Sequence, residues 1–227
     1  MVESGAAPTH IVPIYEGYSL PHAIIGKNLV GGCHLDLYFM KLMAEKGYKC
    51  ETTADRDIFK KVKESVCYTA LDFDTEMESM ENPDNIISYE LPDGRKISLG
   101  SERFKCPELI FSPNLDNIEV AGLHEHVVNS IRKCDPDLKT SMLFPNIILS
   151  GGSTLFPNIE KRLKKEIMSF SAPGEAQKTC VEAPPNRLHS AWIGGAILSG
   201  LSTFENMWIS KTEYDDYGPG IVHKKCF

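Results

Sequence analysis

The segment Asn146-Ile147-Ile148-Leu149-Ser150-Gly151-Gly152-Ser153-Thr154-Leu155-Phe156-Pro157 decides the fold of this chain. An apolar run rich in β-branched residues ends at a pair of glycines, and a proline follows where a new helix would begin. Ile159, Leu163 and Ile167 then recur at helical spacing, so we predict a strand, a tight turn and a helix over 158–170. Pro157 suits the first turn of that helix, where its missing N–H is not needed.

This turn has two interpretations. A strand-to-helix turn points backbone N–H groups outward beside a helix start, and glycines let a polyanion approach the main chain closely. Gly151 and Gly152 are therefore candidates for a contact with nucleotide phosphate. A plain connection, whose glycines serve only packing, fits the same spacing equally well.

Composition and charge narrow the class of protein. The chain has 227 residues, 42% of them hydrophobic and 24% charged, which is ordinary for one large or two small globular domains. It has no uncharged apolar run of about 18 residues, so we expect no membrane span. It also lacks a basic start followed by an apolar block, so we expect no secretion. The net charge is −7, with basic pairs only at Lys164-Lys165 and Lys224-Lys225, which argues against nucleic acid as the main ligand.

The seven cysteines are odd in number and scattered, and none forms a Cys-x-x-Cys pair. This pattern disfavours a zinc site and a disulfide framework, and favours reduced thiols in the cytoplasm. The cysteines are Cys33, Cys50, Cys67, Cys106, Cys134, Cys180 and Cys226.

Upstream of the central segment we predict a strand or a hairpin over 9–18, with a turn at Glu16-Gly17. A helix with Leu35 and Phe39 inward should end near Gly47. Thr52 and Asp55 have the spacing of a capping box, so a second helix should follow them.

The outer face of this second helix carries Asp57, Lys60, Lys61 and Glu64. These residues fit a solvated face with salt bridges between successive turns, and the helix alone favours that interpretation over a binding site. His10 is similarly ambiguous, since it could point into a site or be a satisfied strand histidine.

The remaining segments complete the prediction. We expect an exposed acidic loop over 72–85, two strands around Pro92-Asp93-Gly94 and irregular structure over 104–117. Leu123, Val127 and Ile131 mark a helix, and a short helix should follow Pro136. A polar loop should span 171–178, and a closely packed helix 192–201. Strands that alternate with helices predict an α/β core with an appended, more helical lobe.

Several short segments of this sequence resemble segments of actins. They run through nearly the whole chain from Thr9 onward, and include Val12-Pro13-Ile14-Tyr15-Glu16-Gly17-Tyr18, Tyr89-Glu90-Leu91-Pro92-Asp93-Gly94, Leu149-Ser150-Gly151-Gly152, Trp192-Ile193-Gly194-Gly195 and Lys225-Cys226-Phe227. The resemblance, to a divergent actin or actin-related protein, implies the actin/Hsp70/sugar-kinase (ribonuclease H-like) α/β fold. It covers only the C-terminal part of an actin, namely the large domain and the C-terminal segment of the small domain.

By the layout of that family, residues 1–30 and 119–186 would form the inner lobe of the large domain. Residues 31–118 would form the outer lobe inserted in it, and residues 187–227 would be the small-domain segment. That last segment would lack most of its own sheet.

The resemblance also implies a nucleotide site. The residues that match the family's contacts with adenine, ribose and phosphate are Gly5, Asp57, Lys60, Lys63, Glu64, Gly151, Gly152, Ser153, Leu155 and Phe156. Leu188 stands where the family usually has a lysine against the base, so that contact would be lost. Near Gly31-Gly32, where an actin carries a glycine beside the nucleotide, the chain has one extra residue.

The phosphate turn departs further from the family. Actins carry an Asp-Ser-Gly-Asp-Gly-like turn, whereas this chain reads Glu3-Ser4-Gly5-Ala6-Ala7-Pro8. Glu3 could replace one carboxylate near Mg²⁺, through water, but Ala6 removes another, Ala7 adds a Cβ and Pro8 deletes an N–H donor. His10 matches the family's water-positioning histidine, but its usual partners belong to a part of an actin that this chain lacks. We therefore expect either weak binding of ATP or ADP with Mg²⁺ or no cofactor, and no hydrolysis by this chain alone.

The resemblance further implies a partner cleft lined by Gly17, Tyr18, Ile193, Ile197, Leu198, Leu201, Thr203 and Met207. Such a groove takes an amphipathic helix through apolar anchors, although the same residues fit an ordinary core equally well. Two functions follow. The first is a structural or interaction subunit of an actin-containing or actin-related assembly in the cytoplasmic cytoskeleton, with actin-related subunits and actin-binding proteins as partners and neither nucleic acid nor membrane. The second is a filament-forming ATPase whose N-terminal half is absent from this chain.

Overall fold

The computed structural model describes residues 1–27, 29–80 and 82–226. The chain divides into two compact units, Met1–Leu188 (unit 1) and His189–Phe227 (unit 2). The predicted domain and lobe boundaries, including the one between Asn186 and Arg187, stay predictions.

A four-stranded mixed sheet forms the centre of unit 1. Its strands β1 (Val2–Glu3), β2 (His10–Ile11), β7 (Ile147–Ser150) and β8 (Val181–Glu182) stand in the order β2-β1-β7-β8. β1 runs antiparallel to β2 and parallel to β7, with Val2 opposite Leu149. Because parallel strands end at the same edge of a sheet, the turns that follow β1 and β7 meet there.

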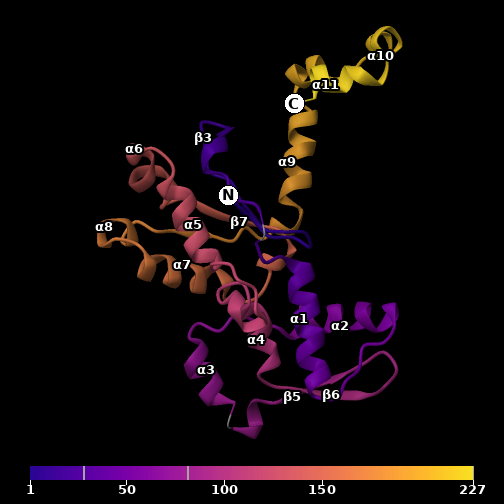
Figure 1. Ribbon diagram of the computed structural model, residues 1–227, viewed down its shortest axis with the longest axis vertical. Helices are drawn as coiled ribbons and strands as arrows, with labels where there is room; N and C mark the ends of the chain where they lie inside the picture. The colour runs from indigo at the N-terminus through magenta and orange to yellow at the C-terminus, as the bar shows by residue number, and fades with distance from the viewer. Residues whose placement is uncertain (28, 81, 227) are drawn as a thin grey trace. The chain divides into compact units, whose positions relative to one another are not determined.

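Two helices, α5 (Leu123–Arg132) and α7 (Ile159–Phe170), pack side by side in unit 1 (Figure 1). The residues predicted to face inward are buried in both: Leu123, Val127 and Ile131 in α5, and Ile159, Leu163 and Ile167 in α7. The predicted strand, turn and helix are thus confirmed. Pro157 precedes the helix instead of opening it, and its carbonyl accepts a hydrogen bond from the Thr69 N–H at 2.9 Å.

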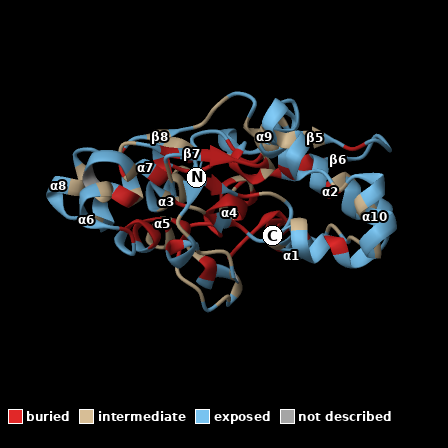
Figure 2. Cartoon of the chain, turned by 90° about the horizontal axis from the view of Figure 1, so that it is seen from above, coloured by how far each residue is buried: buried red, intermediate tan, exposed pale blue. Residues whose placement is uncertain are grey.

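A second group of helices comprises α1 (Gly32–Glu45), α2 (Thr53–Val66) and α4 (Glu102–Glu108), with α2 and α4 each packed against α1. The predicted capping box is present. The Asp55 N–H donates to Thr52 Oγ1 at 3.1 Å, and the Thr52 N–H donates to Asp55 Oδ2 at 2.9 Å. The buried residues in the middle of unit 1 continue from the sheet into these helices (Figure 2).

Two hairpins form, and the first covers only part of the predicted stretch 9–18, because β2 pairs with β1 instead. β3 (Ile14–Tyr15) pairs with β4 (Tyr18–Ser19) across Glu16 and Gly17, which both have positive φ. β5 (Ile87–Glu90) pairs with β6 (Lys96–Leu99), and Gly94 takes φ +82° in the turn between them. The glycine is needed there because L-residues rarely adopt that conformation.

Two segments differ from their predictions. The acidic stretch 72–85 is not a simple loop, because it contains helix α3 (Phe73–Ser79). The Asp72 side chain caps this helix by accepting from the Thr75 N–H, and the Phe73 ring packs edge-on against Phe104 at 5.8 Å. Glu81, in the same stretch, lies outside the described residues.

The second difference is α4, which extends from Glu102 into the stretch 104–117 that we predicted to be irregular. Pro107 lies within it. Proline cannot donate to the carbonyl of Arg103 four residues earlier, but that carbonyl accepts from the Tyr68 N–H at 3.1 Å instead. A neighbouring segment thus replaces the bond that proline removes, which permits the helix.

The other elements are short. The described ones in unit 1 are η1 (Pro21–Ala23), η2 (Pro83–Asn85), η3 (Pro113–Asp116), α6 (Pro136–Leu138), the π-helical η4 (Lys139–Leu143), η5 (Gly152–Thr154) and α8 (Pro173–Ala176), while η6 (Arg187–His189) spans the break between the units. The predicted short helix after Pro136 is confirmed. The predicted polar loop 171–178 instead contains the single turn α8.

Unit 2 consists of helices and turns in its described residues: α9 (Ser190–Ser199), η7 (Ser202–Met207), α10 (Lys211–Tyr217), η8 (Gly218–Ile221) and α11 (Val222–Lys225). The predicted helix over 192–201 forms, but its close packing is wrong. None of the residues of α9 is buried, and Trp192 is 75% exposed (Figure 2). The physical reason is that the described part of unit 2 contains no sheet on which this apolar helix could pack.

Candidate functional site

A cavity of about 450 Å³ opens where the turns after β1 and β7 meet. It is lined by the β1 turn, the start of α1, the Lys60–Glu64 part of α2 and the turn after β7. The lining residues are Glu3, Gly5, Ala6, Gly32, Asp36, Lys60, Lys63, Glu64, Gly151, Gly152, Ser153, Leu155, Phe156 and Leu188. The structure therefore brings together most of the residues that the sequence singled out for a nucleotide.

Gly151 joins the two turns. It has φ +91°, and a Cβ at this position would lie 2.4 Å from the Ser4 carbonyl oxygen. The Ser4 N–H donates to the Ser150 carbonyl at 2.8 Å, and the Ser153 N–H donates to the Ser4 carbonyl at 2.9 Å. Gly151 thus serves the packing of two chain segments, whereas Gly152 faces the cavity with only Leu188 nearby. The packing interpretation thus holds for Gly151, whereas a contact between Gly152 and a phosphate stays a prediction.

The β1 turn is also tied to the start of α1. The Gly32 N–H donates to the Gly5 carbonyl at 2.8 Å, and the Cys33 N–H donates to the Ala6 carbonyl at 2.9 Å. A Cβ at Gly31 would lie 2.0 Å from the Ala7 carbonyl oxygen, so glycine is required there. The first N–H groups of α1, which could otherwise bind an anion, are used within the protein.

The β1 turn itself keeps main-chain donors. The N–H groups of Gly5, Ala6 and Ala7 donate to no residue that the structure describes. A Cβ at Gly5 would meet nothing within 4 Å, so the turn is open beside the cavity. The turn therefore loses fewer backbone N–H donors than the sequence suggests. Pro8 removes one N–H group, but Gly5, Ala6 and Ala7 retain theirs.

The cavity lining offers little uncompensated positive charge. Lys63 is only 4% exposed, and its Nζ lies 2.5 Å from Asp36 Oδ1. The ammonium group is thus already neutralised from within the wall. Three carboxylates line the cavity, on Glu3, Asp36 and Glu64, against two ammonium groups, on Lys60 and Lys63, which leaves a formal charge of −1.

The opposite wall is apolar. Phe156 is 6% exposed, with Lys63 Nζ 6.0 Å from the centre of its ring. Leu155 and Leu188, which are 42% and 50% exposed, also line the cavity. Side chains of this kind suit a flat, uncharged ring system such as a nucleobase.

Two predicted residues lie elsewhere. Asp57 is exposed on α2 and is not part of the cavity lining. His10 lies on β2 against Gly26, whose missing side chain leaves room for the imidazole, since a Cβ there would be 2.4 Å from His10 Cδ2. The structure therefore does not place His10 at the cavity.

Sequence reasoning missed Asp36 and Gly31. Asp36 interrupts an apolar helix face, but only the buried partner Lys63 on another helix shows its role. Gly31 and Gly32 were visible as a departure from the family pattern, yet their close approach to Ala7 and Gly5 depends on the tertiary structure.

The residues present fit a nucleoside better than a magnesium triphosphate. Among the described residues, no three His, Cys, Asp or Glu side chains gather as a metal site. Glu3, predicted to reach Mg²⁺ through water, does line the cavity.

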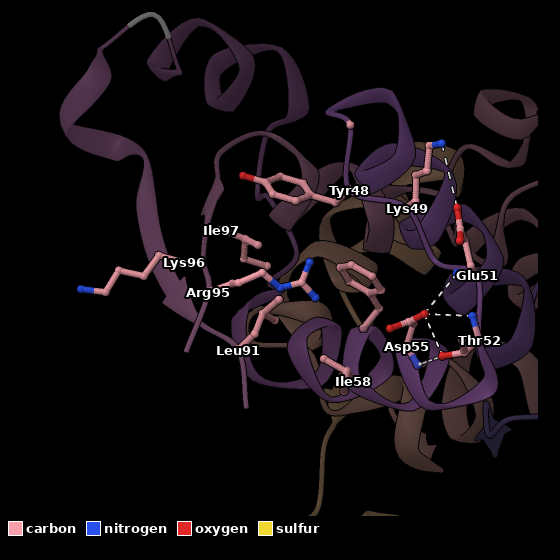
Figure 3. Close-up of a pocket in the computed structure, with 12 residues that line it drawn as sticks. Tyr48, Lys49, Glu51, Thr52, Asp55, Ile58, Leu91, Arg95, Lys96 and Ile97 are labelled. Carbon is pink, nitrogen blue, oxygen red and sulfur yellow. Dashed lines mark hydrogen bonds and ion pairs between the residues drawn. The ribbon is translucent and has the colours of Figure 1, made fainter. Parts of the chain in front are cut away.

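A second cavity, of about 630 Å³, lies between the start of α2 and the β5–β6 hairpin (Figure 3). Figure 3 shows Asp55 bound to Thr52 and Glu51, and Lys96 extending away from the cavity. Arg95 is held by Asp93, with Nε 2.6 Å from Oδ2. These charged groups serve the local structure, and no residue predicted for the nucleotide lies there.

The predicted partner cleft draws on both units, which are described separately. In unit 1, Gly17 and Tyr18 are exposed in the β3–β4 hairpin. In unit 2, Ile193 is half-buried, and the other predicted residues, Ile197, Leu198, Leu201, Thr203 and Met207, are exposed.

The mixed sheet, with its helices and a cavity at the end of its parallel strands, defines an α/β protein. A family model described as Actin matches residues 1–227, and the chain therefore belongs to the actin family. The α/β architecture is accordingly that of the actin/Hsp70/sugar-kinase fold. Within the described residues, no helix has both the length and the apolar character needed to cross a bilayer.

Proposed function

We propose that this chain is a structural interaction subunit of an actin-containing or actin-related assembly of the cytoskeleton. Its cavity then binds an adenine nucleotide mainly through the base and weakly through the phosphates. In this proposal residues 1–30 and 119–186 are the inner lobe, residues 31–118 the outer lobe, and residues 187–227 the small-domain segment.

The charge of the cavity carries this proposal. A triphosphate brings about four negative charges, and a lining with a formal charge of −1 does not offset them. Lys63, the most buried cation of the lining, already has Asp36 as its counterion at 2.5 Å. The remaining N–H donors of the β1 turn can hydrogen-bond to phosphate oxygens, but they bring no positive charge to offset the negative charge of the triphosphate.

The exposed apolar side chains of unit 2 support an interaction role. Trp192, Ile197, Leu198, Leu201, Met207 and Trp208 are all at least 49% exposed. Apolar surface costs roughly 25 cal/mol per Å² to leave in water, so such residues favour a partner. The partners that fit are actin or actin-related subunits and actin-binding proteins.

One observation favours the alternative, a filament-forming ATPase. The N–H groups of Gly5 and Ala6, which donate to no residue that the structure describes, border the cavity and could hold a phosphate. Hydrolysis would also need a group that positions water, and His10, the predicted candidate, lies outside the cavity lining.

The affinities of a series of ligands distinguish the two functions. We expect adenosine, ADP and ATP to bind with affinities within about tenfold of one another, measured by calorimetry with and without Mg²⁺. Submicromolar ATP binding with turnover, and more than about a hundredfold preference over adenosine, would establish the ATPase instead. Co-sedimentation with filaments of ordinary actin tests the interaction role, and its absence would remove actin itself as the partner.

A further inference from the structure

An open groove of about 960 Å³ lies on unit 1 apart from the nucleotide cavity. One wall is the segment from η1 to Lys27, and the other is the C-terminal half of α5. We call it the basic groove, because Lys27, Arg132 and Lys133 line it together with His10 and His126. Among the described residues, no carboxylate lines it and none of its residues lines the nucleotide cavity.

This concentration of one charge is unusual for the chain, whose net charge is −7. Basic residues in the last turn of a helix stabilise the helix dipole, which accounts for part of the pattern in α5. It does not account for Lys27, which comes from a different segment and faces the same groove. Cations from separate segments that converge without carboxylates create a local positive potential that attracts an anion.

Two of the cations are free to bind. Lys27 and Lys133 are exposed, and neither forms an ion pair with any residue that the structure describes. Arg132 is partly engaged, since its guanidinium donates to the Phe170 carbonyl at 3.4 Å and lies 3.9 Å from Glu175. Lys27 and Lys133 therefore provide most of the available charge.

The rest of the lining indicates the class of ligand. Pro21 and Ile24 are exposed apolar residues of the groove, and the Asn129 amide lies beside the basic side chains. No phenylalanine, tyrosine or tryptophan lines it among the described residues, so nucleobases find no aromatic side chain on which to stack. A concave groove also fits an extended chain better than the flat surface of a membrane.

We infer that the basic groove binds an acidic, partly apolar segment of a partner protein. The carboxylates of that segment pair with Lys27 and Lys133, and its apolar side chains contact Pro21 and Ile24. This inference goes beyond the proposed function and makes no use of the nucleotide cavity.

The test uses a fluorescein-labelled, glutamate-rich peptide with interspersed leucines, and fluorescence anisotropy at low salt. We expect saturable binding that weakens as salt is raised. The double variant Lys27→Glu/Lys133→Glu should lose about tenfold or more in affinity, because two attractive contacts become repulsive. The matched control is Lys161→Glu/Lys164→Glu, which reverses two exposed lysines of α7 outside the groove and should change affinity less than about twofold.

Several results would overturn the inference. One is unchanged affinity in Lys27→Glu/Lys133→Glu, and another is an equal loss in the α7 control. A third is tighter binding of an oligonucleotide or of phosphatidylserine vesicles through the same two lysines. A fourth is self-association that this double variant abolishes, because the occupant would then be a second copy of the chain. Adenosine binding should stay unchanged in Lys27→Glu/Lys133→Glu, so a failure here is distinct from a failure of the proposed function.

Discussion

Arg162 of α7 and Glu108 of α4 form a buried, bidentate ion pair that joins the two helices. Arg162 Nη1 lies 2.9 Å from Glu108 Oε2, and Nη2 lies 2.7 Å from Oε1. The side chains are 8% and 3% exposed. Arg162 also donates to the Ala70 carbonyl at 2.8 Å and stacks over Phe111, so the pair has few unsatisfied groups.

Breaking this pair from one side should be costly. Arg162→Met leaves the Glu108 carboxylate buried without a counterion, so we expect a loss of about 3–5 kcal/mol in the free energy of unfolding. Arg162→Met/Glu108→Leu should recover part of that loss, because both charges are then removed. Urea unfolding of the variants measures both quantities, with Lys161→Met as the exposed control on α7. Equal stabilities for Arg162→Met and the wild type would refute the role of the pair.

Removing carboxylates from the 450 Å³ cavity that we propose for the nucleotide should increase the affinity for ATP but not for adenosine. Glu3→Gln/Glu64→Gln changes the formal charge of the lining from −1 to +1 without altering the apolar wall. We expect ATP affinity to rise by roughly threefold to tenfold at low salt while adenosine affinity stays the same. Calorimetry with both ligands measures the difference, and Glu160→Gln on α7 is the control. A parallel change for adenosine would mean that the substitutions reshape the cavity.

Acid should weaken unit 1 through His124. This imidazole stacks on Phe111 and meets Phe170 edge-on, and its Nδ1 has no hydrogen-bond partner among the described residues. Burial lowers the pKa of His124, an effect that Glu166 and Glu125 oppose and that Arg162 and His126 reinforce. An unfolded histidine, with a pKa of about 6.5, then binds more protons than the folded one, so stability is full above that pH and falls as pH drops below it.

Unfolding measured between about pH 7.5 and pH 5 tests this prediction. His124→Phe keeps an aromatic ring between Phe111 and Phe170 but cannot be protonated, so the fall in stability should become shallower. His126 should sustain part of it, because burial lowers the pKa of His126 as well. His22→Gln, at an exposed position, should leave the slope unchanged. An unaltered slope in His124→Phe would exclude His124 as the source.

The exposed apolar residues of unit 2 should make the free chain associate. Ile197→Glu/Leu201→Glu removes two of them, which are 63% and 49% exposed. We expect less association in sedimentation velocity and a change in the free energy of unfolding of only about 0.5 kcal/mol, because neither side chain is buried. Ser199→Glu adds charge to the same helix without removing apolar surface and serves as the control. A wild-type chain that is monomeric and melts sharply would contradict this prediction.

Local patterns allowed most of the architecture to be predicted. The Thr52–Asp55 capping box and the Gly94 turn depend on neighbours within a few residues, and both form as expected. Helix α4 escaped prediction because Tyr68, far away in sequence, supplies the bond that Pro107 cannot. Helix α9 was predicted, but its packing was not, because burial depends on what surrounds a helix.

The candidate site shows the same division. The residues predicted for a nucleotide came from the resemblance to the actin family. The structure gathers most of these residues around one cavity. Two contacts join residues of different helices and turns. They are the ion pair of Lys63 with Asp36 and the close approach of Gly31 to Ala7. These long-range contacts set the electrostatics of the cavity, and no spacing within the chain reports them.

The Lys63–Asp36 pair has a consequence for measurement. An ammonium group that already carries its counterion releases few ions when a neutral ring arrives, so occupancy of that cavity should hardly respond to potassium chloride. Lys27 and Lys133 have no such counterion in the part of the chain that the structure describes, and whatever binds them should leave as the salt rises. One titration series, read with two ligands in a single sample, can therefore assign each binding event to its own surface.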